Sequence, residues 1–259
     1  MSETTSGAQT VEAERAVGPR VALLALLAAV LPVVGTIAQT PLSNAPHNLL
    51  ANLLYYDSHS SAVYFGAVIR AIGTVALIAP LLFLMRSATA RGANVPRFAP
   101  GLTVVGVVLV AISTLAVSIA SVGFSQRFAT DTAITYIQAK NLLKGQAILA
   151  ASAAGLIGSL SVGFGFVMAS LNAMRVGLLT RFMGYVGILG GVLFVIPILS
   201  PVPIVQAFWL IAVAALIFGR WPSGMPPAWE DGEAHKWPSA AEARERAAAE
   251  REARSNGGA

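Results

Sequence analysis

The stretch SAVYFGAVIRAIGTVALIAPLLFLM, from Ser61 to Met85, is a long apolar run that contains one charged residue, Arg70. An α-helix rises about 1.5 Å per residue, so about 20 apolar residues cross a hydrocarbon core about 30 Å thick. Six such runs predict an all-α, polytopic membrane protein with six transmembrane helices, and the five later runs contain Arg70 as their single charged residue. The runs are Val21–Gln39, Ser61–Met85, Gly101–Phe124, Gln146–Leu171, Phe182–Leu199 and Pro203–Gly219.

The composition of the whole chain agrees with this prediction. Of its 259 residues, 56% are apolar and 11% are charged, and the mean hydropathy is +0.70, whereas a soluble domain has about 25% charged residues. The chain has no cysteine, which excludes a disulfide framework, a thiolate nucleophile and Cys-based metal sites. The net charge of +5 comes with no basic, aromatic-interleaved segment, so no nucleic-acid partner is predicted.

No charged residue marks the boundary between the fifth and sixth runs, because none lies between Arg181 and Arg220. A single helix of that length would overrun the bilayer. The sequence Ser200-Pro201-Val202-Pro203 removes backbone donors where a turn is needed. We therefore expect two short helices that form a tight hairpin.

Basic residues beside the runs predict the orientation, because Lys and Arg are retained on the cytoplasmic side. One side has eight of them and the other has three, so both termini are predicted to be cytoplasmic, in a bacterial cytoplasmic membrane. A cleaved signal peptide over the first run is the alternative, but Thr36-Ile37-Ala38 fits a cleavage site poorly. The eight are Arg15, Arg20, Arg86, Arg91, Arg97, Arg175, Arg181 and Arg220, and the three are Arg127, Lys140 and Lys144.

The segments outside the runs have separate predictions. Residues 1–18 are expected to be a disordered cytoplasmic tail, residues 19–219 the transmembrane domain, and residues 220–259 a cytoplasmic segment. In the outer loops, one short interfacial helix is predicted from Asn44 through Leu54, and another from Thr130 or Asp131 to Gly145.

The C-terminal segment contains three tryptophans, Trp221, Trp229 and Trp237, with prolines beside or close to each. Interfacial anchoring of the indoles is the favoured interpretation, and docking of a partner is the alternative. Beyond them, Ser239 and Glu242 form a capping box for an Ala-rich, charged helix.

A stripe of small residues spaced by four predicts close helix packing in the fourth run. The fifth run adds further glycines. The contact could lie within the bundle or between subunits, and a narrow pathway or mobile interface is the functional alternative. The packing residues are Ala147, Ala151, Gly155, Ser159 and Gly163 in the fourth run, and Gly184, Gly187, Gly190 and Gly191 in the fifth.

Arg70 is the strongest candidate for a binding residue. It lies about 13 Å along its helix from the outer end, where burial of a cation costs at least about 2.5–3.5 kcal/mol. Either it contacts an anionic solute in an outer cavity, or it is structural. Asp57 and Asp131 are the carboxylates on the outer side of the membrane, so they are the candidate partners of Arg70 and, with it, the candidate substrate-binding residues. If neither reaches Arg70, the guanidinium snorkels, is held by neutral dipoles or is free to meet an anionic solute.

The residues needed for catalysis are scarce. His47, Asp57 and His59 form only a weak metal-ligand pattern. The serine nucleophile motif, the intramembrane Asp pair and the HExxH motif are all missing from the sequence. We therefore predict no enzyme activity, no cofactor and no metal.

Two stretches near the C-terminus carry a recognisable pattern. The first is NAMRVGLLTRFMG (Asn172–Gly184), and the second runs from GRWP (Gly219–Pro222) through PPAWE (Pro226–Glu230) to KWP (Lys236–Pro238). They resemble a family of uncharacterised bacterial multi-pass integral membrane proteins. The resemblance implies the architecture, and it implies no activity and no functional residue.

Two functions remain open from the sequence. The first is a non-enzymatic membrane component in the lipid bilayer, partnered by a second copy or by another membrane protein. The alternative is a transporter or channel for a small or anionic solute, with Arg70 in an outer vestibule. A cavity that reaches Arg70 would favour the alternative.

Overall fold

The computed structural model describes residues 2–39, 49–130, 145–196, 203–222 and 224–235. The regular secondary structure of these residues is helical, without a strand, which confirms the all-α prediction. The helices are α1 (Ser2–Ala38), α2 (Leu49–Ser58), α3 (Ser60–Ala76), α4 (Ile78–Ala90), α5 (Ala99–Thr130), α7 (Gln146–Arg175), α8 (Arg181–Val195), α9 (Ile204–Ile217) and α10 (Ala228–Asp231).

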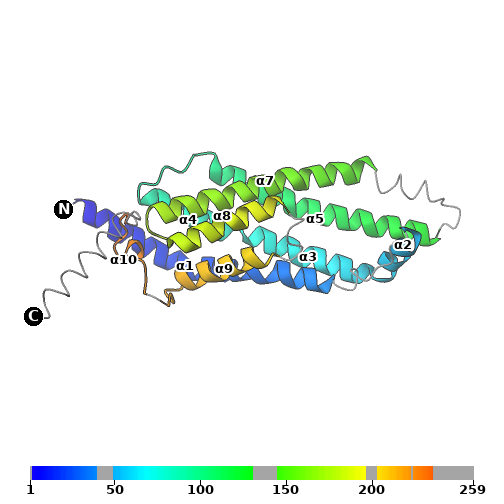
Figure 1. Ribbon diagram of the computed structural model, residues 1–259, viewed down its shortest axis with the longest axis horizontal. Helices are drawn as coiled ribbons and strands as arrows, with labels where there is room; N and C mark the ends of the chain where they lie inside the picture. The colour runs from blue at the N-terminus through cyan, green and yellow to red at the C-terminus, as the bar shows by residue number, and fades with distance from the viewer. Residues whose placement is uncertain (1, 40–48, 131–144, 197–202, 223, 236–259) are drawn as a thin grey trace, which may run out of the picture.

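The helices form one elongated bundle (Figure 1). The start of α1, the α4–α5 and α7–α8 connections and α10 lie together at one end, and α2 lies at the other. We call the first end the arginine-rich end. Its arginines belong to the helix ends that meet there, and they are Arg86, Arg91, Arg97, Arg175, Arg181 and Arg220.

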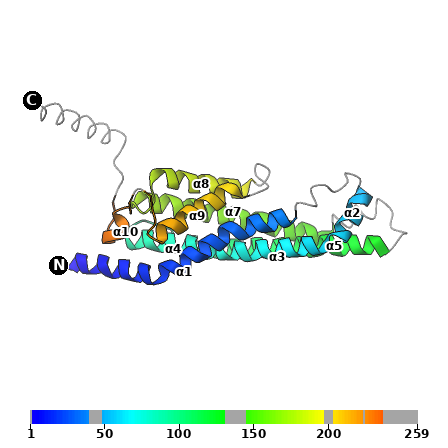
Figure 2. The ribbon, with the colours of Figure 1, turned by 90° about the horizontal axis from the view of Figure 1, so that it is seen from below.

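Four helical segments of the described chain are long and apolar enough to cross a membrane. They are Gly7–Ala38, Ser60–Ala90, Ala99–Arg127 and Ile148–Arg175. The helices α8 and α9 are shorter, with 15 and 14 residues. They lie along the half of the bundle nearest the arginine-rich end (Figure 2). The bundle therefore has four long helices and a short hairpin beside one half of them.

The run Ser61–Met85, predicted as one helix, is divided at Leu77 into α3 and α4. Pro80 has no backbone N–H, so the carbonyl of Ala76 lacks its helical donor. At the same place, the Leu77 N–H donates to the carbonyl of Thr74, three residues back. The break is thus the local consequence of one proline.

The expected disordered tail over residues 1–18 is a further difference, because α1 begins at Ser2. Val11 in this segment is buried. A Cβ atom added to Gly7 would lie 2.7 Å from the carbonyl oxygen of Asp231. The polar composition suggested a tail, but contacts with distant residues hold this segment as a helix.

Several predictions fall on residues outside the described ranges. Of the first outer helix the structure describes the part from Leu49 onward, as α2. The segments from Asn44 to His47 and from Asp131 to Lys144 lie outside, as does the charged helix beyond Ser239.

The small-residue stripe of α7 contacts different neighbours along its length. A Cβ atom on Gly155 would collide with Ser113 of α5, and the Ser113 hydroxyl donates to the carbonyl of Ala151 at 2.7 Å. A Cβ atom on Gly163 would lie 2.7 Å from the carbonyl oxygen of Gly191, on α8. Since four residues turn a helix by about 400°, such a stripe rotates by about 40° per step. The stripe therefore passes from α5 to α8.

The glycines of α8 also pack within the chain. Gly187 lies against Ser170 of α7, and a Cβ atom there would lie 2.5 Å from Nε1 of Trp209. That nitrogen donates to the carbonyl of Met183 at 2.9 Å, which fixes the indole between the two helices of the hairpin. The side chain of Ala147 is not among those described.

A buried arginine joins three helices at the arginine-rich end. The guanidinium of Arg91, with its side chain 0% exposed, donates to both carboxylate oxygens of Glu14, at 2.6 and 2.8 Å. Its Nε donates to the carbonyl of Ala228 at 2.9 Å, and its NH1 to that of Ser87 at 3.0 Å. The guanidinium carbon lies 5.6 Å from the ring centroid of Trp229. Arg91 thereby connects α1, α4 and α10.

Trp229 docks inside the protein rather than standing free. It is buried, its Nε1 donates to the carbonyl of Leu178 at 2.9 Å, and its ring stacks on Phe83. Trp221 packs against the same core, and Trp237 lies outside the described residues.

His235, which had no partner in the sequence pattern, contacts Asp231 through its Nε2. Its backbone N–H donates to the carbonyl of Val176 at 3.0 Å. Although burial acts to raise it, the pKa of Asp231 lies below its ordinary value, because the Glu233 N–H and the His235 ring hydrogen-bond the carboxylate. These contacts hold the segment after α10 against the α7–α8 connection.

Candidate functional site

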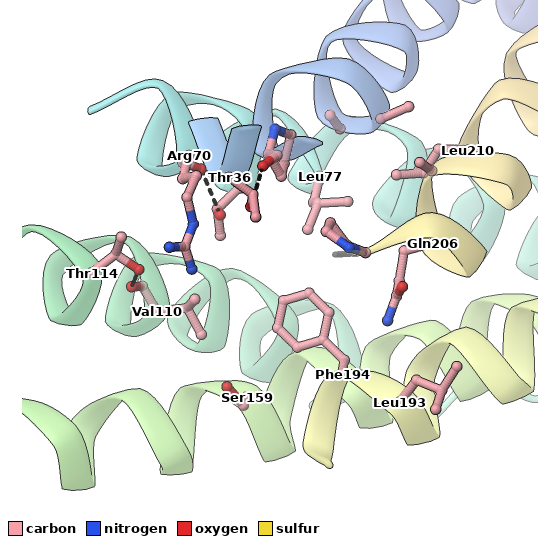
Figure 3. A pocket seen from close by; sticks show the side chains of 16 residues that line it. Thr36, Arg70, Leu77, Val110, Thr114, Ser159, Leu193, Phe194, Gln206 and Leu210 are labelled. Carbon is pink, nitrogen blue, oxygen red and sulfur yellow. Dashed lines mark hydrogen bonds between the residues drawn. The ribbon is translucent and has the colours of Figure 1, made fainter. Parts of the chain in front are cut away.

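A cavity of about 200 Å³ lies at the tip of the α8–α9 hairpin (Figure 3). It is lined from six helices, α1, α3, α5, α7, α8 and α9. Most of the lining is apolar, including Leu77, Phe194 and Leu210, and Arg70 is its one charged residue. The structure therefore places the predicted binding residue in a cavity.

Arg70 has a neutral side-chain partner. Its NH1 donates to Oε1 of Gln39 at 3.3 Å, and the Gln39 Nε2 donates to the carbonyl of Val63 at 3.1 Å. A guanidinium has five N–H donors, so one amide leaves most of its capacity unused. The ion pairs among the described residues are Arg91–Glu14 and His235–Asp231, and neither involves Arg70.

The two predicted carboxylate partners have different outcomes. Asp57 is described, on α2, and it makes no ion pair with Arg70. Asp131 lies outside the described residues, so its pairing with Arg70 stays a prediction.

Glycines set the position of Arg70 between α1 and α3. A Cβ atom on Gly35 would lie 2.5 Å from Cγ of Arg70 and 2.7 Å from the carbonyl oxygen of Gly66. A Cβ atom on Gly66 would lie 2.7 Å from Cγ of Gln39. The two helices therefore approach closely, and the Arg70 stem and the Gln39 amide occupy the room that the glycines leave.

Gln206 of α9 is a second polar residue of the lining, and sequence reasoning missed it. Its side chain is nearly enclosed, at 6% exposed. Its Nε2 donates to the carbonyl of Gly190 at 3.1 Å, while its Oε1 is buried without a hydrogen-bond partner. The available signal was a lone amide inside an apolar run.

Four hydroxyls complete the polar lining. Thr36, Thr74 and Thr114 each donate to the carbonyl four residues earlier in their own helix, at 2.8 Å. Their protons are used, but oxygen lone pairs remain. Ser159, predicted as a packing residue, also lines the cavity. It lies where the α7 stripe turns from α5 toward α8.

The other predicted groups are arranged for structure. The His59 Nδ1 lies 2.9 Å from the carbonyl oxygen of Tyr55, and the two rings stack. Among the described residues no group of three His, Asp or Glu side chains is placed to hold a metal ion. The cavity at Arg70 is thus a binding arrangement, with one cation, several acceptors and an apolar wall.

No family model, curated protein or solved structure matches this chain. The resemblance to a family of bacterial multi-pass membrane proteins therefore stays a prediction. The two stretches that carry it contact each other, since His235 binds the carbonyl of Val176 and Trp229 that of Leu178.

Proposed function

We propose that this protein crosses a bacterial cytoplasmic membrane six times, with both termini in the cytoplasm. In this proposal it binds a small anionic solute at Arg70 as part of a transport function. The observation that carries the proposal is the cavity, in which Arg70 contacts a neutral amide and no described carboxylate. A buried cation without a counter-charge is costly, and an anion that enters the cavity removes the cost.

The depth of Arg70 supports a vestibule on the outer side. If the arginine-rich end marks the cytoplasmic boundary, Arg70 lies about 22 Å along the helix from Met85. Phe194, at the hairpin tip, lies about 20 Å from Arg181 by the same measure. Both residues line the cavity, and the two lengths agree in placing it in the outer third of a core about 30 Å thick.

A structural component or partner subunit is the second candidate, and it ranks lower. Its main support was the small-residue stripe as a surface for a second copy or another membrane protein. Gly155, Gly163, Gly187 and Gly191 instead meet residues of this chain. Their packing is accounted for without a partner.

Cysteine labelling tests the proposal, because the chain has no cysteine of its own. Ser159→Cys places a thiol in the lining. In intact cells an impermeant, anionic methanethiosulfonate should label it from outside, and faster than the cationic analogue of similar size. Arg70→Gln should lower the anion-to-cation rate ratio by about 3- to 10-fold, the order expected when a unit charge that lines the same cavity is removed in a largely aqueous environment.

Two controls accompany the labelling. Ile157→Cys lies on the same helix, 57% exposed on the apolar outer surface, and should not react. Arg175→Gln removes an exposed arginine at the far end of α7 and should leave the rate ratio unchanged. A rate ratio at Ser159→Cys that does not depend on Arg70 would overturn the proposed anion site.

A further inference from the structure

The geometry points to the chemical class of the solute: a small monoanion, of the carboxylate type, that carries a neutral hydroxyl at its other end. The anionic group binds Arg70 and the hydroxyl donates to Gln206. This inference rests on the proposed function and deepens it. The observation behind it is the Oε1 of Gln206, an enclosed acceptor without a partner on a residue that lines the cavity.

The orientation of the Gln206 amide is fixed by its neighbour. The carbonyl of Gly190 can only accept, so the Nε2 side of the amide must face it. The acceptor Oε1 is then left without a donor. A buried acceptor without a donor is unfavourable. A ligand that supplies an O–H therefore forms the hydrogen bond to Oε1 that no described protein group forms.

The rest of the lining also offers acceptors. The hydroxyl protons of Thr36 and Thr114 are already donated within their helices. Pro32 has no N–H, so the carbonyl of Ala28, another lining residue, lacks its helical donor. Apart from Arg70 and the Ser159 hydroxyl, the polar groups of the cavity therefore favour a ligand that donates.

The charge of the lining limits the charge of the ligand. Arg70 is the single charged residue that lines the cavity. A monoanion is neutralised by it, whereas a dianion leaves one charge uncompensated in a mostly apolar site. A zwitterion brings an ammonium group into a site that is already positive. The favoured donor is therefore neutral.

Size and shape limit the ligand further. The cavity of about 200 Å³ corresponds to about seven water volumes, at about 30 Å³ each. Figure 3 shows Arg70 and Gln206 on opposite sides of the Phe194 ring. A ligand with one polar group at each end and an apolar middle that passes Phe194 matches this arrangement.

Binding of matched acids to the purified full-length protein in detergent tests the inference by calorimetry. The probes are hydroxy acids of three to five carbons with a terminal hydroxyl, each paired with its unsubstituted acid, for example 4-hydroxybutyrate and butyrate. At the best chain length the hydroxy acid should bind about 2- to 10-fold more tightly, the range for one net hydrogen bond. The zwitterion 4-aminobutyrate should bind more weakly than butyrate.

Gln206→Leu should bring the ratio of the two affinities to about one, while Arg70→Gln should weaken both acids. The comparison in the wild-type protein holds even if a variant does not fold. Equal binding in every pair, or tight binding of 4-aminobutyrate, overturns the inference. If no acid binds but the anion preference of the thiol at position 159 persists, the ligand class is wrong and the proposed function stands. If both effects are missing, both proposals fail.

Discussion

Two arginines of this chain occupy opposite environments. Arg91 is fully enclosed, and a carboxylate and two carbonyls use its donors. Arg70 meets one neutral amide at the edge of a cavity. The charge of Arg91 is thus compensated within the fold, whereas the charge of Arg70 is left available for a ligand. This difference makes Arg91 structural and Arg70 the candidate for binding.

The partner of Arg70 can be tested by a double-mutant cycle. Gln39→Leu should destabilise the wild type and have little further effect in an Arg70→Gln background, because the two side chains are hydrogen-bonded. Thermal unfolding in detergent measures both losses. Asp57→Asn should add independently of Arg70→Gln. A coupling energy between Arg70 and Asp57 larger than that with Gln39 would contradict the structure, and Asp131→Asn tests the remaining carboxylate.

Glu14→Gln tests the arginine-rich end. The substitution leaves Arg91 buried without its counter-charge, so we expect a loss of about 3–5 kcal/mol in unfolding free energy. Faster tryptic cleavage after Arg220 should accompany the loss, because Arg91 also holds the carbonyl of Ala228. The matched control is Glu12→Gln, an exposed carboxylate on the same helix. Equal behaviour of the two variants would show that the ion pair is unimportant.

The sequence was sufficient to identify Arg70, because one charge among apolar residues must be satisfied by something. It was insufficient for its surroundings. Glu14 and Arg91 are 77 residues apart, and their pairing depends on how α1 and α4 end at the same place. Gln39 and Gln206 carry no charge, so they did not stand out from the apolar runs.

At the level of helices, the small-residue stripe on α7 winds slowly around the helix axis, so it faces different neighbours along its length. Ala151 and Gly155 meet α5, Ser159 reaches the cavity, and Gly163 meets α8. The same four-residue spacing thus serves two packing interfaces and, between them, the wall of the cavity.

Gly155→Leu should destabilise the bundle by about 1–3 kcal/mol, because the position faces Ser113 without room for a side chain. Thermal unfolding in detergent measures the effect. Ala153→Leu, at an exposed position on the same helix, should leave the unfolding temperature almost unchanged. A silent Gly155→Leu would mean that the α5–α7 contact is looser than the structure shows.

Helix positions followed from hydropathy much better than helix ends did. The described residues of the six apolar runs are mostly helical, and the run Phe182–Leu199 extends past the described residues. The break at Leu77 could have been inferred from Pro80. The helix over Ser2–Gly18 could not, because its burial comes from residues more than 60 positions away, such as Arg91 and Asp231.

At the level of the whole molecule, the predicted orientation depends on one end of the bundle being rich in arginine. The structure brings the arginines of three connections, α4–α5, α7–α8 and α9–α10, to that end, while α2 lies at the other (Figure 1). The positive-inside rule then assigns the arginine-rich end to the cytoplasm.

Introduced thiols check this orientation. Ser58→Cys on α2 should react with an impermeant maleimide in intact cells, whereas Asn94→Cys, between α4 and α5, should react only after permeabilisation. Both positions are exposed, so access to the reagent depends on the side of the membrane. Labelling of Asn94→Cys from outside would reverse the topology.

The short hairpin has a consequence for the surrounding lipid. Helices of 15 and 14 residues are about 22 and 21 Å long, less than a core about 30 Å thick. If the hairpin stands in the bilayer with the proposed orientation, acyl chains of the outer leaflet beside α8 and α9 must tilt or shorten, at a modest free-energy cost per ångström of mismatch. Because Phe194 and Gln206 belong to the hairpin tip, bilayers of shorter-chain lipids should favour the cavity as the structure has it, and longer-chain lipids should strain it.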